Sequence, residues 1–429
     1  MSALLQQLAH SRGAQRGIYS VCSAHPWVLE AAMRRHAPCA GPLLIEATCN
    51  QVNQFGGYTG MTPAEFRDLV FSIAANAGFR RENILLGGDH LGPFPWQHLA
   101  AEEAMAKAMD LVRLFVQAGY SKIHLDASMA CLGDPHPLPD ATIAERAARL
   151  CVAAEAAANG NPPVYVIGTE VPTPGGAVDE MELSVTSPAD AERALRLHRE
   201  AFSAAGLEAA WERIVALVVQ PGVEFGHDSV HDYQPPLAQS LCAVLAKHPN
   251  LVFEAHSTDY QTPEALAALV RDGFNILKVG PALTFAMRQA IFALAAIEAE
   301  CLPPSRQSHL PRKIEEVMLH SPEQWQKHYA GSSEEQHRLR IHSYSDRIRY
   351  YWQNPEVRQA VEKLVANLED GGIPETMLSD YLPVQYAKVR RQMLQSRPLP
   401  LIFDCIGDAL DPYIAACGCA SGSAGNQAS

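Results

Sequence analysis

The sequence predicts an α/β protein, a TIM-type (β/α)8 barrel over residues 1–300, followed by a helical C-terminal region over 301–417 and a disordered tail over 418–429. Three observations predict it. Eight short apolar segments recur along the first two-thirds of the chain, each ending in polar or small residues. A helix with a recognisable start signal follows nearly every segment, as in a parallel sheet. This alternation stops near residue 301.

The eight apolar segments are the predicted strands of the barrel. They span residues 18–23, 43–48, 84–90, 123–127, 164–170, 214–220, 251–256 and 276–280. Eight strand and helix units favour a closed barrel over an open doubly wound sheet. An open dinucleotide-binding sheet would place a Gly-x-Gly-x-x-Gly turn after its first strand. The chain has Ser-Ala-His-Pro at 23–26 instead.

Start and stop signals of the predicted helices agree with this alternation. Residues 62–65, Thr-Pro-Ala-Glu, form a capping box with proline at the first helical position. Ser187-Pro188 and Thr262-Pro263 repeat the device before two later helices. Gly119 and Gly273 stand just before the next strands, where the left-handed residue that ends a helix belongs.

The C-terminal third begins with a linker at 303–306, Pro-Pro-Ser-Arg, and then shows only helical patterns. These patterns lie at 314–319, 357–368, 377–393 and 401–416. Between them, residues 344–352 combine Arg347 and Arg349 with four aromatic side chains. Arginine next to aromatic rings serves either packing and protein interfaces or the recognition of an anionic ligand, and both remain open.

Composition excludes several classes of function. The net charge is −13 and no block of Lys and Arg occurs, which argues against nucleic acid or an anionic membrane as a partner. Residues 1–17 contain no apolar signal core, and the longest apolar run, 290–297, is far shorter than the roughly 18 residues of a membrane span. We therefore expect a cytoplasmic protein. Its ten cysteines form no framework, which predicts reduced thiols, Cys417 and Cys419 included.

The polar residues at the strand ends are the candidate site, because the C-terminal ends of all barrel strands face one mouth. They are Cys22, His25, Glu46, Asn50, Asp89, His90, His124, Asp126, Glu170, Gln220, Glu224, His227, Glu254, His256 and Lys278. The alternation of side chains along a strand puts His124 and Asp126 on one face, and likewise Glu254 and His256.

Asp89 and His90 follow two glycines at the end of the third strand, which suits a general base beside a metal ligand. The alternative is an aspartate that caps the next loop with a histidine packed beneath it. His90, His227 and His256 come from three strands and are predicted to bind a divalent metal. Here the alternative is a set of hydrogen-bonded structural histidines, since buried polar groups need partners.

Long stretches of the sequence resemble the GatZ/KbaZ family, the so-called non-catalytic subunits of class II D-tagatose-1,6-bisphosphate aldolase from galactitol and N-acetylgalactosamine catabolism. They include IEATCNQVNQFGGYT at 45–59, GGDHLGP at 87–93, GTEVPTPGG at 168–176, EAHSTDYQTP at 254–263, LKVGPALTFAMR at 277–288 and SYSDRIRYYW at 343–352. The resemblance implies a TIM barrel that associates with a separate catalytic aldolase subunit. It would support that subunit's activity and stability in a chaperone-like way.

A more distant resemblance links the chain to catalytic class II aldolases. Asp89 is similar to their proton-transfer residue, and His90, His227 and His256 are similar in placement to their zinc ligands. The resemblance therefore implies zinc. Two turns differ from those of the catalytic enzymes. Residues 257–259 and 280–282 occupy the positions at which those enzymes bind the substrate phosphates. A carboxylate at 259 would repel a phosphate, so we predict that this chain has lost the ability to bind a bisphosphate at this position.

Two functions of different class remain open. The first is the accessory subunit. The second is a metal-dependent epimerase or aldolase that acts on a ketohexose or its phosphate. In the second, Asp89 or Glu170 moves protons. The residues predicted to contact the substrate are Glu46, Asn50, Asp126 and Lys278. Loss of the phosphate turns favours the first function or an unphosphorylated substrate, whereas the charged mouth favours the second.

Overall fold

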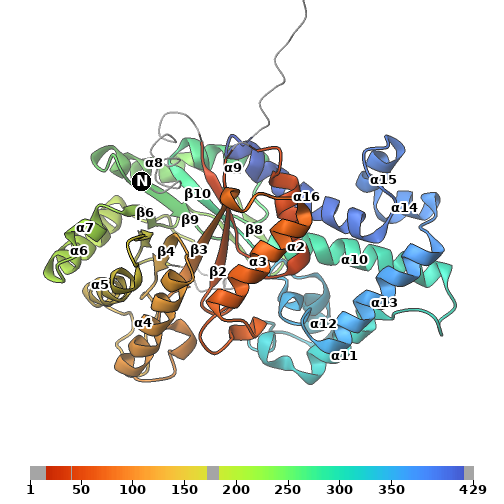
Figure 1. Ribbon diagram of the computed structural model, residues 1–429, viewed down its shortest axis with the longest axis horizontal. Helices are drawn as coiled ribbons and strands as arrows, with labels where there is room; N and C mark the ends of the chain where they lie inside the picture. The colour runs from red at the N-terminus through yellow and green to blue at the C-terminus, as the bar shows by residue number, and fades with distance from the viewer. Residues whose placement is uncertain (1–15, 40, 172–182, 420–429) are drawn as a thin grey trace, which may run out of the picture.

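The computed structural model describes residues 16–39, 41–171 and 183–419, and its centre is a closed barrel of eight parallel strands (Figure 1). The strand order around the barrel is β1-β10-β9-β6-β5-β4-β3-β2. The strands are β1 Ile18–Val21, β2 Leu43–Thr48, β3 Ile84–Leu91, β4 Lys122–Leu125, β5 Val164–Ile167, β6 Ile214–Val218, β9 Val252–Ala255 and β10 Phe274–Val279. The predicted (β/α)8 fold is confirmed, and each strand overlaps its predicted segment.

Helices follow the strands and surround the barrel. They are α2 Pro26–His36, α3 Pro63–Ala77, α4 Ala101–Gln117, α5 Asp140–Ala157, α6 Pro188–Ala204, α7 Glu208–Trp211, α8 Pro235–Cys242, α9 Pro263–Arg271 and α10 Pro281–Cys301. The capping box at Thr62 is present, with its side chain accepting from the Glu65 N–H. Ser187 and Thr262 cap α6 and α9 in the same way. The start signals in the sequence therefore mark real helix ends.

Short elements complete the loops of the barrel and of the C-terminal region. Single 3-10 turns lie at η1 Gly57–Thr59, η2 Arg81–Asn83, η3 Phe94–Trp96, η4 Ala243–Lys247, η5 Pro322–Gln324 and η6 Arg347–Tyr350. After β6 the chain forms a small antiparallel hairpin of β7, Glu224–Phe225, and β8, Val230–His231. The sequence did not predict this hairpin, since two-residue strands carry no periodic pattern.

The C-terminal region is helical, as predicted. Its helices are α11 Leu310–His320, α12 Ser333–His342, α13 Pro355–Gly371, α14 Glu375–Tyr381, α15 Pro383–Arg390 and α16 Pro398–Ala416. The predicted pattern at 377–393 divides into α14 and α15, because Pro383 lacks the N–H that a continuous helix needs. Helix α12 was missed because its sequence, SEEQHRLRIH, has no apolar stripe. Of the predicted disordered tail, residues 420–429 lie outside those described, and the domain limits remain a prediction.

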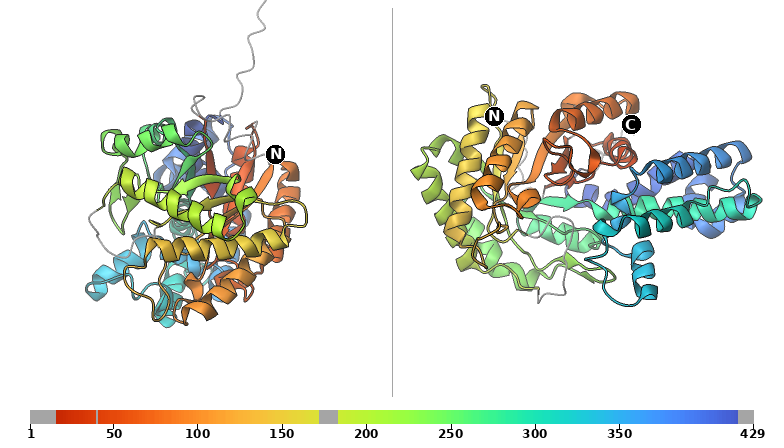
Figure 2. Two further views of the ribbon diagram at one scale, coloured as in Figure 1. Left: turned by 90° about the vertical axis from the view of Figure 1, so that its left-hand side faces the viewer. Right: turned by 90° about the horizontal axis from the view of Figure 1, so that it is seen from below.

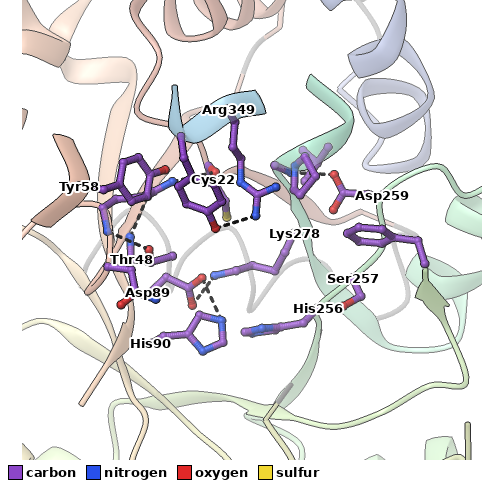
Figure 3. Close-up of a pocket in the computed structure, with 17 residues that line it drawn as sticks. Cys22, Thr48, Tyr58, Asp89, His90, His256, Ser257, Asp259, Lys278 and Arg349 are labelled. Atoms are coloured by element: carbon purple, nitrogen blue, oxygen red, sulfur yellow. Dashed lines mark hydrogen bonds and ion pairs between the residues drawn. The ribbon is translucent and has the colours of Figure 1, made fainter. Parts of the chain in front are cut away.

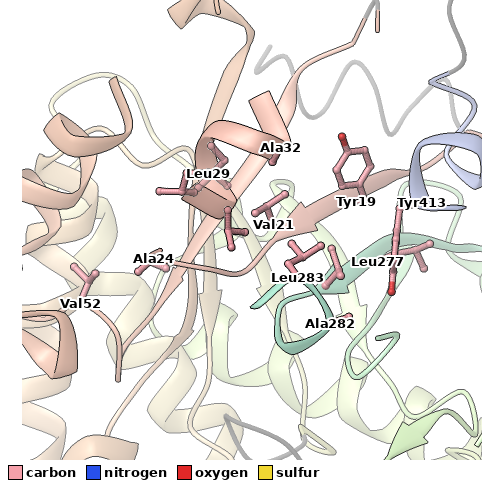
Figure 4. Packing of buried hydrophobic residues seen from close by; sticks show 14 of the residues in the cluster. Tyr19, Val21, Ala24, Leu29, Ala32, Val52, Leu277, Ala282, Leu283 and Tyr413 are labelled. Carbon is pink, nitrogen blue, oxygen red and sulfur yellow. The ribbon is translucent and has the colours of Figure 1, made fainter. Parts of the chain in front are cut away.

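Helix α16 returns from the C-terminal region to the barrel and packs against α2, α9 and α10. Its Tyr413 is buried beside Tyr19 of β1, with ring centroids 6.4 Å apart, and close to Leu277 of β10 (Figure 4). The remaining helices, α11 to α15, project from one side of the barrel together with the far end of α10 (Figure 2). Within the described part of the chain, α10 alone is long and apolar enough to span a membrane, and 67% of its most apolar window is buried inside the protein.

Candidate active site

A cavity of about 100 Å³ opens at the C-terminal ends of the strands (Figure 3). Loops after six strands and the 3-10 turn η6 of the C-terminal region surround it. Its lining comprises Cys22, Thr48, Asn50, Gln51, Tyr58, Asp89, His90, Phe225, His256, Ser257, Asp259, Lys278, Val279, Gly280, Pro281, Arg349 and Tyr350. Most of these side chains carry charge or hydrogen-bonding groups, which suits a small polar ligand.

Beneath the cavity, two lysines and three carboxylates form a buried ion-pair network. The Lys278 Nζ lies 2.5 Å from Glu46, 2.8 Å from Asp89 and 3.4 Å from Glu254. The Lys122 Nζ lies 2.7 Å from Glu46 and 2.8 Å from Glu254. None of the five side chains is more than 6% exposed. Ion pairs between these side chains therefore stabilise the barrel interior directly below the cavity.

A glycine on the neighbouring strand makes room for this network. Gly87 of β3 pairs with Glu46 of β2 in the sheet register. A Cβ atom at position 87 would lie 2.5 Å from the Glu46 Oε1. Any larger residue would push that carboxylate away from the lysines, so the close approach requires glycine here.

Three histidines from three strands lie next to the ion pairs. Each ring pairs with a carboxylate: His124 Nδ1 with Asp89 at 3.0 Å, His90 Nδ1 with Asp126 at 2.8 Å, and His256 Nε2 with Glu254 at 3.0 Å. The ring centroids of His90, His124 and His256 are 4.8 to 5.4 Å apart. The three imidazole rings therefore form one cluster.

The environment sets the protonation states of these groups. Burial alone would raise the pKa of Asp89, but His90, Lys278 and His124 hold it well below its usual range. Asp89 is therefore a carboxylate at neutral pH. Burial lowers the pKa of His256 to about 4, although Glu254 opposes the change. His256 is thus neutral at pH 7, with a ring nitrogen able to bind a metal ion.

Four of these residues could hold a metal ion together. Asp89, His124, Glu254 and His256 each offer one ligand atom, and these atoms all lie within 4.8 Å of one another. The His124 Nε2 is buried and has no hydrogen-bond partner in the described part of the chain. Two imidazoles with carboxylates suit zinc or a similar divalent ion. The donor set fits such an ion, although Lys278 already supplies positive charge to two of its carboxylates.

Most residues predicted from the sequence lie at or directly below the cavity. Asn50, Asp89, His90, His256 and Lys278 line it. Two further predicted residues, Glu46 and Asp126, are buried one layer deeper and hold Lys278 and His90.

Glu170 and His227 are not part of this group. Glu170 is exposed, accepts a hydrogen bond from the Thr186 hydroxyl and does not line the cavity. The ring nitrogens of His227 lie 3.1 Å from the Ser345 Oγ and 2.9 Å from the His328 carbonyl oxygen, both in the C-terminal region. The predicted set of His90, His227 and His256 is therefore corrected. The reason is the hairpin after β6, which carries His227 against the C-terminal region instead of into the barrel mouth.

His124 and Glu254 were among the predicted strand-end residues but had no assigned role, Arg349 had two open roles, and Lys122 was not predicted. Lys122 carried a usable signal, because it lies two residues before His124 in an apolar strand and so faces the barrel interior together with it. Arg349 lies in the segment for which packing and ligand recognition were both open. It lines the cavity, and its Nη2 donates to the Tyr350 hydroxyl at 2.9 Å.

Comparison with known proteins adds independent information. The family model described as "D-tagatose-1,6-bisphosphate aldolase subunit GatZ/KbaZ-like" matches residues 3–418. A crystal structure of a probable tagatose 6 phosphate kinase from Sinorhizobium meliloti 1021 is 51% identical, covers 94% of this chain and 100% of its own, and superposes with a TM-score of 0.88. The fructose-bisphosphate aldolase of Campylobacter jejuni is 13% identical over 89% of this chain and 95% of its own, with a TM-score of 0.45.

Proposed function

Since the chain belongs to the GatZ/KbaZ-like family of D-tagatose-1,6-bisphosphate aldolase subunits, we propose that it is a metal-dependent enzyme acting on a ketohexose or a ketohexose phosphate. One observation carries the proposal: buried carboxylates, lysines and histidines meet directly beneath an open polar cavity. Buried charges cost free energy even when paired, so a purely supporting role gives no reason to keep them there.

The proposed metal is zinc, held by His124, Glu254 and His256, with Asp89 as a fourth donor or as the base. A bound divalent ion would polarise the ketose carbonyl. In retro-aldol cleavage a base removes a hydroxyl proton, a carbon–carbon bond breaks, and its electrons move toward the carbonyl. Rejoining the fragments with one of them turned over gives an epimer. The same residues therefore serve an aldolase or an epimerase.

Asp89 and Lys278 are the residues that would act on the substrate. Asp89 lines the cavity as a carboxylate, so it can accept the hydroxyl proton. The Lys278 ammonium is 2.8 Å from Asp89 and also lines the cavity, where it can stabilise negative charge on a substrate oxygen. The role of Glu170 in proton transfer remains a prediction from the sequence.

A substrate screen tests the enzyme proposal. Ketohexoses and their phosphates, incubated with protein loaded with zinc, manganese or cobalt, are expected to be cleaved or epimerised. Asp89→Asn should lower kcat by about 10²- to 10⁴-fold. The matched control Asp68→Asn changes a carboxylate that is 66% exposed and should leave kcat unchanged. If metal-loaded protein turns over none of these sugars, the enzyme proposal is wrong.

The second candidate is the accessory subunit of a catalytic class II tagatose-bisphosphate aldolase, in cytoplasmic galactitol or N-acetylgalactosamine catabolism. The family description as a subunit supports it. So do the projecting C-terminal helices, where the exposed fractions of Tyr381, Val384 and Met393 are 41%, 56% and 72%. Exposed apolar side chains within one short segment, here from the end of α14 to just past α15, are typical of a protein interface.

Co-expression with a catalytic subunit tests this candidate. The two proteins are expected to co-elute, with higher soluble yield and activity of the partner. Val384→Asp with Met393→Asp should abolish the association, because buried aspartates would remain unpaired in the interface. Leu132→Asp, which changes a leucine that is 66% exposed on the barrel, is the control and should not affect it. Separate elution with no change in the partner's activity would rule out the accessory role.

A further inference from the structure

We infer that Asp259 occupies an anion-binding position inside the cavity. The site therefore accepts a ligand with a hydroxyl group next to Asp259 and excludes a ligand with a phosphate group there. The inference extends the prediction that a carboxylate at 259 repels phosphate, and it rests on the proposed binding of a sugar or sugar phosphate at this site. It concerns which end groups fit the cavity of the isolated chain.

The first observation is the position of the carboxylate. Asp259 is 3% exposed, and its Oδ1 accepts hydrogen bonds from the backbone N–H of Gly280 at 2.9 Å and of Ala282 at 2.8 Å. Both N–H groups lie at the start of α10, the helix that follows the last barrel strand. Free N–H groups at a helix start attract anions, and in TIM barrels phosphates bind at the loops after the last two strands. The chain's own carboxylate already uses these donors.

The second observation is that Asp259 and this helix start form part of the cavity wall. Asp259, Gly280 and Pro281 line the cavity together with Arg349, and Figure 3 shows Asp259 and Arg349 at its upper rim. A phosphate at this end would meet a carboxylate in a largely desolvated position, where like charges repel strongly. A hydroxyl group could instead donate a hydrogen bond to Asp259.

The turn that carries Asp259 is fixed by its neighbours. Its flanking residues Ser257 and Tyr260 have φ angles of +54° and +65°, which only surrounding contacts can maintain. The Thr258 hydroxyl donates to the Lys278 carbonyl oxygen at 2.6 Å, and the Tyr260 hydroxyl donates to the Tyr344 carbonyl oxygen at 2.6 Å. The carboxylate is therefore held against the helix start by strand β10 and by the C-terminal region. A phosphate could not simply push it aside.

Binding of inorganic phosphate to variants of the isolated chain tests this inference. Titration calorimetry and thermal unfolding at pH 8 are expected to show only weak phosphate binding by the natural chain. Asp259→Ala frees both N–H groups and removes the negative charge, so phosphate should bind about tenfold or more tightly than to the natural chain and should raise its Tm. Asp259→Asn keeps an acceptor in the same place and should gain no binding.

The control is Asp190→Ala, which removes a carboxylate from the first turn of α6, outside the cavity, and should gain no phosphate binding. If Asp259→Ala does not fold, Asp259→Ser retains a hydroxyl cap and replaces it. A folded Asp259 variant that binds phosphate no better than the natural chain overturns the inference, as does tight binding by the natural chain. Neither result affects the substrate screen or the co-expression test, so the failures are distinguishable.

Discussion

Replacing Lys278 by methionine is expected to lower the free energy of unfolding by about 3–5 kcal/mol. The Lys278 ammonium pairs with Glu46, Asp89 and Glu254 inside the barrel, where none of these carboxylates is more than 3% exposed. Methionine fills a similar volume but leaves Lys122 as the one lysine, among the residues that the structure describes, in contact with the network. The uncompensated negative charge would then destabilise the folded state.

Urea unfolding followed by circular dichroism measures this loss. Lys247→Met is the matched control, because Lys247 is 74% exposed and pairs with Glu192 at 3.0 Å on the surface. The control should lose less than about 1 kcal/mol. A loss of similar size in both variants would contradict the view that Lys278 neutralises the buried carboxylates. Addition of a divalent ion should restore part of the stability of Lys278→Met, since the ion would supply the missing positive charge.

Replacing His124 by alanine is expected to weaken zinc binding by at least about 100-fold. His124 is fully buried, its Nδ1 is held by Asp89, and its Nε2 has no hydrogen-bond partner among the described residues. Loss of one imidazole from a four-donor group leaves too few ligands for a tetrahedral ion. His256→Ala should have a similar effect, because His256 belongs to the same group.

Elemental analysis after dialysis, with chelator competition for the affinity, gives the measurement. His227→Ala is the control and should bind zinc like the natural chain, since its ring contacts Ser345 and His328 instead of the cluster. Circular dichroism shows whether each variant is folded. Loss of zinc from His227→Ala with retention in His124→Ala would restore the ligand set predicted from the sequence alone.

The fold was predictable because its signals are local. Apolar segments marked every barrel strand, and capping residues such as Thr62 and Thr262 marked helix starts. Only two features of the C-terminal region departed from expectation, the polar helix α12 and the break at Pro383.

The site was predictable only in part, because its partners lie far apart in the sequence. Asp89, His90, His124, Glu254 and His256 were all found from strand ends. That His124 faces Asp89 depends on how β3 and β4 pair, and their register shifts between Gly88 and Leu91. The position of His227 depends on a hairpin without any periodic pattern, and the contribution of Arg349 depends on the docking of a distant segment. Neither can be read from spacing along one strand.

Helix α16 has a consequence for how the protein is made. Its residues lie between 398 and 416, yet they cover the outside of α2 and α9 and bring Tyr413 against the first strand. A ribosome makes α2 and α9 before α16, so the nascent barrel emerges with an apolar flank still uncovered. The outer face of α2 and α9 therefore stays exposed until α16 has been made, and exposed apolar surface of this kind promotes aggregation of a nascent chain.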